Sequence, residues 1–219
     1  MYKLFIFDLD GTLVDTGEGI KKALGVFENR LQLKHFPKEK AGFIVGPPII
    51  ESLHKTHPEL PEENLRELSY VFDKIYDENL LYGIFAYDGI KELLDMIHEK
   101  GGIVAIDTAK LSRQALRVLE ESGLLNKIDY IEAWSEEKDN KPLLMADVIK
   151  HFNIPKEEVV AIGDSHFDGE AANVNNIDLI AIKYGYGFGK VDNENEFKPK
   201  YIVNSVEELK QIIIKNIVK

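Results

Sequence analysis

The segment that decides the fold of this chain is Leu4-Phe-Ile-Phe-Asp-Leu-Asp-Gly-Thr-Leu-Val-Asp15. Leu4 to Phe7 form a short apolar run that is typical of a buried strand. The run ends in two carboxylates, Asp8 and Asp10, with no lysine or arginine among them. Ionised carboxylates resist leaving water, and two close together repel each other. A bound divalent cation such as Mg²⁺, which takes oxygen ligands, is the simplest remedy. The segment therefore predicts a metal at the carboxyl end of the first strand.

The composition narrows the classes of protein and partner. The 219 residues suffice for one large domain or a domain with an insertion, and 44% are apolar. The absence of cysteine excludes disulfides, zinc-thiolate sites and cysteine nucleophiles. A net charge of −11 argues against nucleic acid and anionic membranes as partners. The chain starts on a strand pattern without signal-peptide features and has no apolar run long enough for a membrane span, so we expect a cytoplasmic protein.

Short β-rich runs alternate with helical patterns over most of the chain. The predicted strands cover residues 2–8, 103–107, 128–133, 158–163, 178–182 and 201–203. The predicted helices cover 88–100, 111–123, 142–152 and 205–218, and Asp88 is the expected N-cap of the first of these. This alternation predicts an α/β fold with a doubly wound, Rossmann-like parallel sheet.

Residues 16–83 do not fit the alternation. They carry helical patterns at 18–31, 48–55 and 62–80, separated by proline-containing stretches, with no convincing strand between them. We therefore expect an all-helical insertion over 16–83, and a core domain formed by 1–15 and 84–219.

Polar residues follow the predicted strands at their carboxyl ends, where open parallel sheets bind ligands. In chain order these are Asp8 and Asp10; Asp107, Thr108 and Ala109; Lys141; and Asp164 with Asp168. The set combines several carboxylates, a hydroxyl, free backbone amides and one lysine. It suits phosphoryl transfer, because a metal ion and a lysine can neutralise a phosphate dianion beside the acids.

These residues resemble the four motifs of the haloacid dehalogenase superfamily. The motifs are Asp8-Leu-Asp10-Gly11-Thr12-Leu13, Thr108, Lys141-Pro142, and Gly163-Asp164-Ser165 followed by Asp168. They occur in the order and at the spacing of that family, and the insertion at 16–83 resembles its helical cap domain. Gly46-Pro47-Pro48 followed by Glu51-Ser52-Leu53 is similar to the phosphoglycolate phosphatase-like subgroup.

The resemblance implies a phosphatase that uses Mg²⁺ and forms an aspartyl-phosphate. Asp8 attacks phosphorus, and Asp10 protonates the leaving oxygen and then takes a proton from water. Asp8, the main-chain carbonyl of Asp10, and Asp164 hold the metal, and Asp168 supports it directly or through water. The substrate is a small phosphorylated metabolite, and a monomer is the default state, with a dimer as the alternative.

The resemblance also assigns the residues that bind the phosphoryl group. The Thr108 hydroxyl and the Ala109 amide hold phosphoryl oxygens, and Lys141 balances charge and orients Asp8. Two positions depart from the family pattern. Asp107 stands where an apolar or small residue is usual, and strand alternation points it away from Thr108, as a buried or edge acid with a local partner. Ala109 replaces a common asparagine or serine, which removes a side-chain contact to substrate.

Several alternatives remain open at this stage. A pyrophosphatase or a sugar-phosphate mutase shares the fold, although Ile20 occupies the place where such mutases usually carry a histidine. A carbon–halogen hydrolase of the same superfamily does not need a second aspartate, so the presence of Asp10 argues against this alternative. A receiver domain or a catalytically inactive metal-binding scaffold would use similar residues without turnover.

Overall fold

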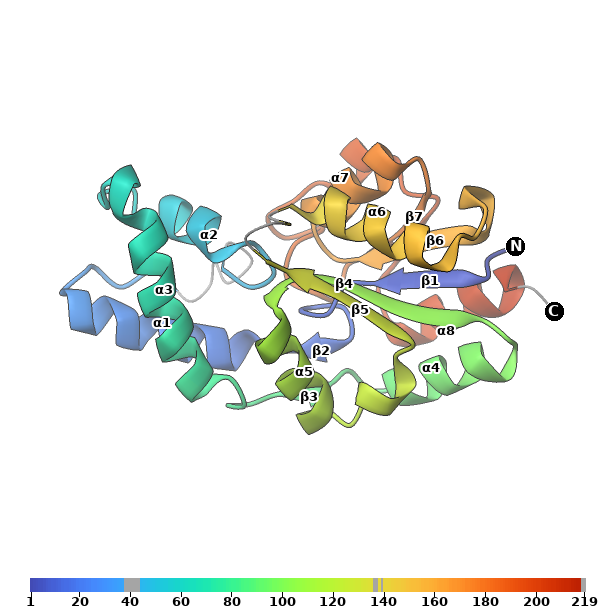
Figure 1. Cartoon of the computed structure of the whole chain (residues 1–219), viewed down its shortest axis with the longest axis horizontal. Helices are drawn as coiled ribbons and strands as arrows, with labels where there is room; N and C mark the ends of the chain where they lie inside the picture. The colour runs from blue at the N-terminus through green and yellow to red at the C-terminus, as the bar shows by residue number, and fades with distance from the viewer. Residues whose placement is uncertain (38–43, 136–137, 139, 218–219) are drawn as a thin grey trace.

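A six-stranded parallel sheet forms the centre of the protein, which we describe from a computed structural model covering residues 1–37, 44–135, 138 and 140–217. Its strand order is β5-β4-β1-β6-β7-β8 (Figure 1). The strands are β1 (Leu4–Phe7), β4 (Ile103–Leu111), β5 (Tyr130–Trp134), β6 (Val159–Gly163), β7 (Asp178–Ile182) and β8 (Tyr201–Val203). The order reverses at β1, so the first strand lies between β4 and β6 at the centre of the sheet.

Helices cover both faces of this sheet, as the predicted doubly wound fold requires. They are α4 (Ile90–Glu99), α5 (Ser112–Glu121), α6 (Lys141–Phe152), α7 (His166–Asn175) and α8 (Val206–Asn216). Phe5 and Phe7 of β1 face a core built with α4, α5 and α8, whereas Leu4 and Ile6 face α6 and α7. The near-continuous apolar run of β1 follows from this burial on both faces. The α/β prediction is confirmed.

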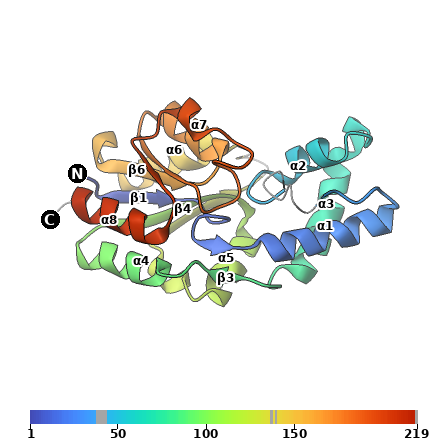
Figure 2. The ribbon, with the colours of Figure 1, turned by 180° about the vertical axis from the view of Figure 1, so that it is seen from behind.

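The segment between β1 and α4 is mostly helical. It contains β2 (Val14–Asp15), α1 (Gly17–Leu31), α2 (Ile49–Thr56), a 3₁₀ turn η2 (Glu62–Asn64), α3 (Leu65–Asn79) and β3 (Phe85–Ala86). Phe27 of α1 packs edge-on against Phe72 of α3, with ring centroids 5.8 Å apart. Figures 1 and 2 show α1, α2 and α3 beyond the end of the sheet to which β1 points. That end carries the predicted site.

Three local features differ from the prediction. The short antiparallel pair β2–β3, with Val14 opposite Ala86, was not expected. Strand β4 continues to Leu111 rather than ending at residue 107. The N-cap of α4 is Gly89 with φ +86°, not Asp88. A glycine adopts this left-handed conformation without steric cost, whereas aspartate does so less readily.

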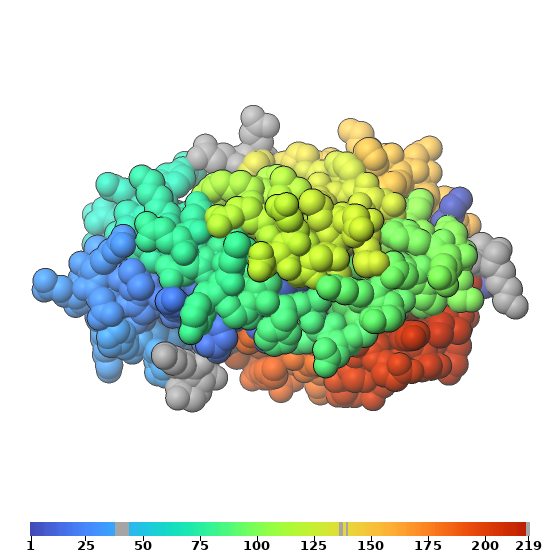
Figure 3. All heavy atoms as spheres, turned by 90° about the horizontal axis from the view of Figure 1, so that it is seen from below, coloured from blue at the N-terminus to red at the C-terminus, as the bar shows by residue number. Residues whose placement is uncertain are grey.

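The surface seen from below belongs to several parts of the chain. In Figure 3 the segment containing α4 and α5 covers the centre of this face, between the helical insertion and the C-terminal segment.

Among the described residues, no helix combines the length and apolarity needed to cross a bilayer.

Candidate active site

Three buried carboxylates meet at the carboxyl ends of β1 and β6. Asp8 follows β1, and Asp164 and Asp168 follow β6, the strand paired with it through Phe7 and Ile162. One oxygen from each of the three carboxylates lies within 4.8 Å of the other two. The structure thus brings together acids that are more than 150 positions apart in the sequence, as the strand-end argument predicts.

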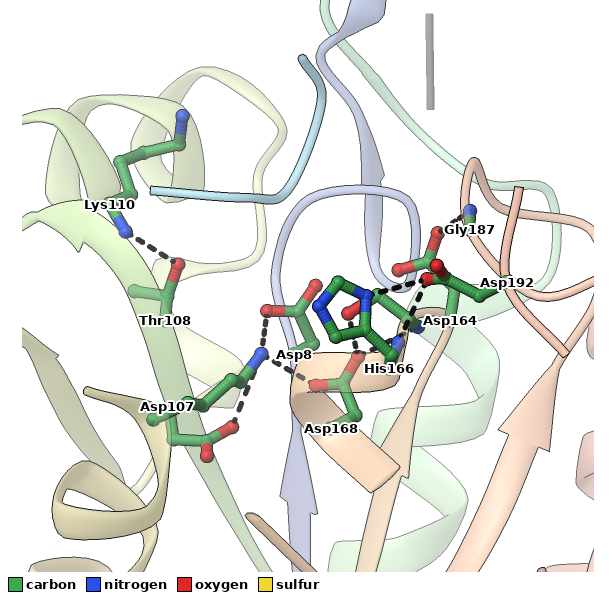
Figure 4. Close-up of polar contacts among 11 residues, drawn as sticks. Asp8, Asp107, Thr108, Lys110, Asp164, His166, Asp168, Gly187 and Asp192 are labelled. Atoms are coloured by element: carbon green, nitrogen blue, oxygen red, sulfur yellow. Dashed lines mark hydrogen bonds and ion pairs between the residues drawn. The ribbon is translucent and has the colours of Figure 1, made fainter. Parts of the chain in front are cut away.

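Lys141 contacts two of these carboxylates, Asp8 and Asp168, which Figure 4 shows beside each other. Its Nζ is 2.5 Å from Asp8 Oδ1 and 2.6 Å from Asp168 Oδ1, while Asp107 Oδ1 is 3.9 Å away. Lys141 is the first residue of α6, where Asn140 Oδ1 caps the helix by accepting from the amide of Leu143. Burial by itself lowers the pKa of Lys141, but the three carboxylates outweigh it and raise the pKa well above its usual value. The lysine therefore stays charged.

Two of these carboxylates, Asp8 and Asp164, resist ionisation. Burial, reinforced by neighbouring acids, raises the pKa of Asp8 well above its ordinary value despite the opposing effect of Lys141. Burial and the charge of Asp168 likewise raise the pKa of Asp164 to about 7. A cation among these oxygens would favour their charged forms. The donor set is purely carboxylate, which fits a hard divalent ion.

The three acids differ in how the protein already holds them. Asp168 uses Oδ1 for Lys141, and its Oδ2 accepts from the amide and the hydroxyl of Ser165 at 2.9 and 2.8 Å. Asp164 Oδ2 accepts from the amides of Tyr186 and Gly187. Both oxygens of Asp168 are therefore engaged by protein donors.

Two glycines let the backbone approach these acids. Gly11 has φ +82°, and a Cβ there would lie 2.5 Å from Asp164 Oδ2. A Cβ on Gly163 would lie 2.0 Å from Asp168 Cγ. Both contacts are shorter than any real Cβ contact, so a side chain at either position would displace an acid of the cluster.

Asp10 lies in a second group of polar side chains beside the cluster. Its Oδ1 accepts a hydrogen bond from the Thr16 hydroxyl, and its Oδ2 is 3.2 Å from the Nζ of Lys110. Lys110 also donates to the hydroxyl of Tyr76 in α3, at 2.8 Å. Asp10 thus contacts both the start of the helical insertion and a buried lysine.

Sequence reasoning missed Lys110, Thr16 and Tyr76. Lys110 stands two residues after Thr108, so both side chains lie on the same side of β4 once the strand is known to continue. That spacing was the available signal. The polar run Asp107-Thr-Ala-Lys110 instead indicated that the strand had ended.

Thr108 and Ala109 lie on β4, directly beside β1. Ile106 pairs with Phe7, which places the two residues next to the turn that carries Asp8. The Thr108 hydroxyl is buried and accepts from the amide of Lys110 at 3.2 Å, while Ala109 is half-buried. Both residues therefore lie at the end of the sheet where the acids gather, and Figure 4 shows Thr108 on β4.

Asp107 is a buried acid, which is one of the two placements that strand alternation left open, but no hydrogen bond among the described residues joins it to the expected local partner. It is 1% exposed, and neither carboxyl oxygen has a hydrogen-bond partner within the described part of the chain. Burial raises its pKa to about 7, although Lys141 opposes the shift. The nearest positive charge, 3.9 Å away on Lys141, is too distant for a hydrogen bond.

Buried acids and a lysine at the carboxyl edge of a parallel α/β sheet form an arrangement that suits phosphoryl transfer. The family described as haloacid dehalogenase-like hydrolase matches residues 5–182. The chain belongs to this family, which confirms the resemblance seen in the motifs.

Similar proteins span almost the whole chain. The pyrophosphatase PpaX of Halalkalibacterium halodurans is 29% identical, over 95% of each chain. A phosphoglycolate phosphatase of Vibrio vulnificus is 27% identical, over 97% of this chain and 96% of its own. The structure of a predicted phosphatase from Clostridium acetobutylicum superposes with a TM-score of 0.85 at 27% identity, over 98% and 99% of the two chains. The predicted phosphoglycolate phosphatase-like subgroup and a phosphatase-type hydrolase class are thereby confirmed.

Proposed function

We propose that this protein is a Mg²⁺-dependent phosphatase that hydrolyses a small phosphate monoester through an aspartyl-phosphate intermediate. The observation that carries the proposal is the buried group of Asp8, Asp164 and Asp168 around Lys141. Membership of a hydrolase family and curated relatives named as phosphatases support it.

Asp8 and Asp10 divide the covalent chemistry between them. An oxygen of Asp8 attacks phosphorus, the bond from phosphorus to the ester oxygen breaks, and Asp10 gives that leaving oxygen a proton. A water molecule then attacks the phosphorus of the aspartyl-phosphate. Asp10 takes a proton from this water, and the bond from phosphorus to Asp8 breaks, which releases inorganic phosphate.

The metal ligands would be Asp8, the main-chain carbonyl of Asp10, and Asp164. Asp168 would support the site from outside this set, because its oxygens already bind Lys141 and Ser165. When bound, Mg²⁺ supplies positive charge that offsets the charge of the phosphoryl oxygens.

The phosphoryl group would be held by residues of β4 and α6. The Thr108 hydroxyl and the Ala109 amide are the proposed donors to its oxygens. Lys141 would contribute positive charge and fix Asp8 through the contact at 2.5 Å. Fixed donors of this kind stabilise developing charge without reorganisation during the reaction.

Residues 16–83 would form a cap domain over a core of 1–15 and 84–219. The contact between Tyr76 of α3 and Lys110 of β4 links the two near Asp10. A cap that covers the site would exclude water from the first step and would have to open for release of the product.

Two substrate classes have specific support. The 27% identical phosphoglycolate phosphatase favours a phosphorylated carboxylic acid, and the 29% identical pyrophosphatase favours a diphosphate. The sugar-phosphate mutase stays an alternative within the family, and an inactive scaffold stays one outside enzymes. The cytoplasmic location and the monomeric state stay predictions.

The test is phosphate release from 2-phosphoglycolate, pyrophosphate, sugar phosphates, nucleotides and an aryl phosphate, ranked by kcat/KM. Chelation of divalent metal should abolish turnover, and added Mg²⁺ should restore it. Full activity in the presence of chelator would exclude the metal role. No phosphate release from any compound would favour the inactive scaffold.

A further inference from the structure

Lys110 is a buried cation that the proposed mechanism leaves without a role. It is 7% exposed and projects from β4 two residues after Thr108. A lysine is seldom buried unless it is paired, because the ammonium group loses its hydration. The groups that pair with Lys110 should therefore indicate its function.

Lys110 has partners on two sides. Its Nζ is 3.2 Å from Asp10 Oδ2 and 2.8 Å from the Tyr76 hydroxyl. The centroid of the Tyr76 ring is 4.6 Å away, which adds a cation–π contact. An ammonium group has three N–H donors, and the contacts of Nζ with Asp10 and Tyr76 use two of them.

Tyr76 contributes a hydroxyl to the same place from the helical insertion. It is 4% exposed, and its oxygen accepts from Lys110. A phenol that accepts one hydrogen bond still has its own O–H to donate. Lys110 and Tyr76 together thus present N–H and O–H donors and one positive charge beside Asp10.

The position of Asp10 fixes which part of a substrate these donors would meet. In the proposed function Asp10 protonates the leaving oxygen, which requires an approach to roughly 3 Å. Lys110 Nζ is 3.2 Å from Asp10 Oδ2. A leaving oxygen bound to Oδ2 would then lie no more than about 6 Å from the ammonium group. A charged group one or two bonds beyond that oxygen is within reach of Lys110.

We propose that Lys110, with the hydroxyl of Tyr76, is a specificity-determining pair that binds an anionic group on the leaving part of the substrate. This inference rests on the proposed phosphatase function and narrows its substrates. They are small phosphate compounds whose leaving group is itself an anion, such as a hydroxy acid or a second phosphate. A neutral alcohol or sugar would leave the buried charge of Lys110 without a partner from the substrate.

The test compares two substrates that differ in one charge. The pair is 2-phosphoglycolate and 2-hydroxyethyl phosphate, in which a hydroxymethyl group replaces the carboxylate. The ratio of their kcat/KM values, measured with Mg²⁺, is the readout. The natural chain should favour phosphoglycolate. Lys110→Met should lower the ratio by about 10- to 100-fold, the factor expected for a lost hydrogen bond to a charged group.

Three further variants make the test specific. Lys110→Arg keeps the charge and should retain most of the preference, and Tyr76→Phe removes only the hydroxyl and should lower the ratio by about 3- to 10-fold. Lys127→Met is the matched control, because Lys127 pairs with Asp95 on the core surface, and it should leave the ratio unchanged. If Lys110→Met does not fold, Lys110→Arg and Tyr76→Phe decide the outcome.

The outcomes separate this inference from the function on which it rests. An unchanged ratio in Lys110→Met and Tyr76→Phe, with both substrates hydrolysed, would overturn the role of Lys110 and leave the phosphatase intact. A natural chain that prefers 2-hydroxyethyl phosphate would do the same. Absence of phosphate release from either compound, from pyrophosphate and from an aryl phosphate would overturn both.

Discussion

Asp107→Asn should stabilise the metal-free protein, and the gain should grow with pH. Asp107 is buried, lacks a hydrogen-bond partner among the described residues, and has a pKa raised from 3.8 to about 7 by burial. Asparagine has nearly the same shape and no charge. The substitution therefore removes the cost of ionising this group without opening a cavity.

The direction of this pH dependence follows from the number of protons that the folded and unfolded states bind. Between pH 3.8 and about pH 7 the folded chain keeps the proton on Asp107, whereas the unfolded chain has released it. The folded state binds more protons in this range, so its stability falls as the pH rises. Each tenfold difference in proton affinity corresponds to about 1.4 kcal/mol. Between pH 5 and pH 8 the contribution of Asp107 should thus fall by about 3 kcal/mol.

Urea unfolding in chelator at pH 5, 6, 7 and 8 would measure this effect. The free energy of unfolding of Asp107→Asn minus that of the natural chain should be about 3 kcal/mol larger at pH 8 than at pH 5. Other titrating groups, such as Asp164, cancel in this difference to the extent that they act independently. Asp88→Asn, at an exposed acid, is the control and should give a flat difference.

A difference that stays constant over this pH range would refute the reasoning. So would an Asp107→Asn protein that is less stable than the natural chain at pH 8. Either result would mean that Lys141, 3.9 Å away, compensates the ionised carboxylate in full.

The remaining predictions concern the acids and the lysine of the cluster. Asp8→Asn should abolish phosphate release, because an amide cannot attack phosphorus, and should leave the circular dichroism spectrum native-like. Turnover at the natural rate would mean that another residue is the nucleophile. Lys141→Met should lower the free energy of unfolding by about 3–5 kcal/mol at pH 8, and by less at pH 5, where Asp107 and Asp164 hold protons. An equal loss at both pH values in urea titrations would contradict this. Mg²⁺ at about 100 times its Kd should add about 2.7 kcal/mol to the stability of the natural chain, and Asp164→Asn should reduce that gain; equal gains in calorimetry would argue against Asp164 as a ligand.

The core and the acids of the site were predictable because local patterns and topology agree. The apolar runs of β1 and β6 each end at an acid, and parallel strands bring their ends to one edge. The alternation of side chains in β4 predicted that Asp107 points away from Thr108 but left open whether it is a buried or an edge acid. These inferences need only the period of a strand and the order of the motifs.

The contacts of Asp10 were not predictable in the same way. Lys110 belongs to β4 only because the strand continues to pair with β5, where Leu111 lies opposite Trp134 after a shift in register. Its partner Tyr76 comes from a helix in the insertion. Both depend on long-range packing, which a local run of polar residues does not reveal. The pair β2–β3 was also not predicted, because strands of two residues carry no periodicity.

The central place of β1 has a consequence for how the chain is made. Strand β1 leaves the ribosome first, yet one of its neighbours is β6, and Asp8 meets Lys141 across 133 positions. Until β6 (Val159–Gly163) has been synthesised, the apolar run Leu4–Phe7 has an open edge, and such edges invite pairing with other chains. Nascent chains that stall before Val159 should therefore aggregate or occupy chaperones, while chains that extend past Ile182 should fold.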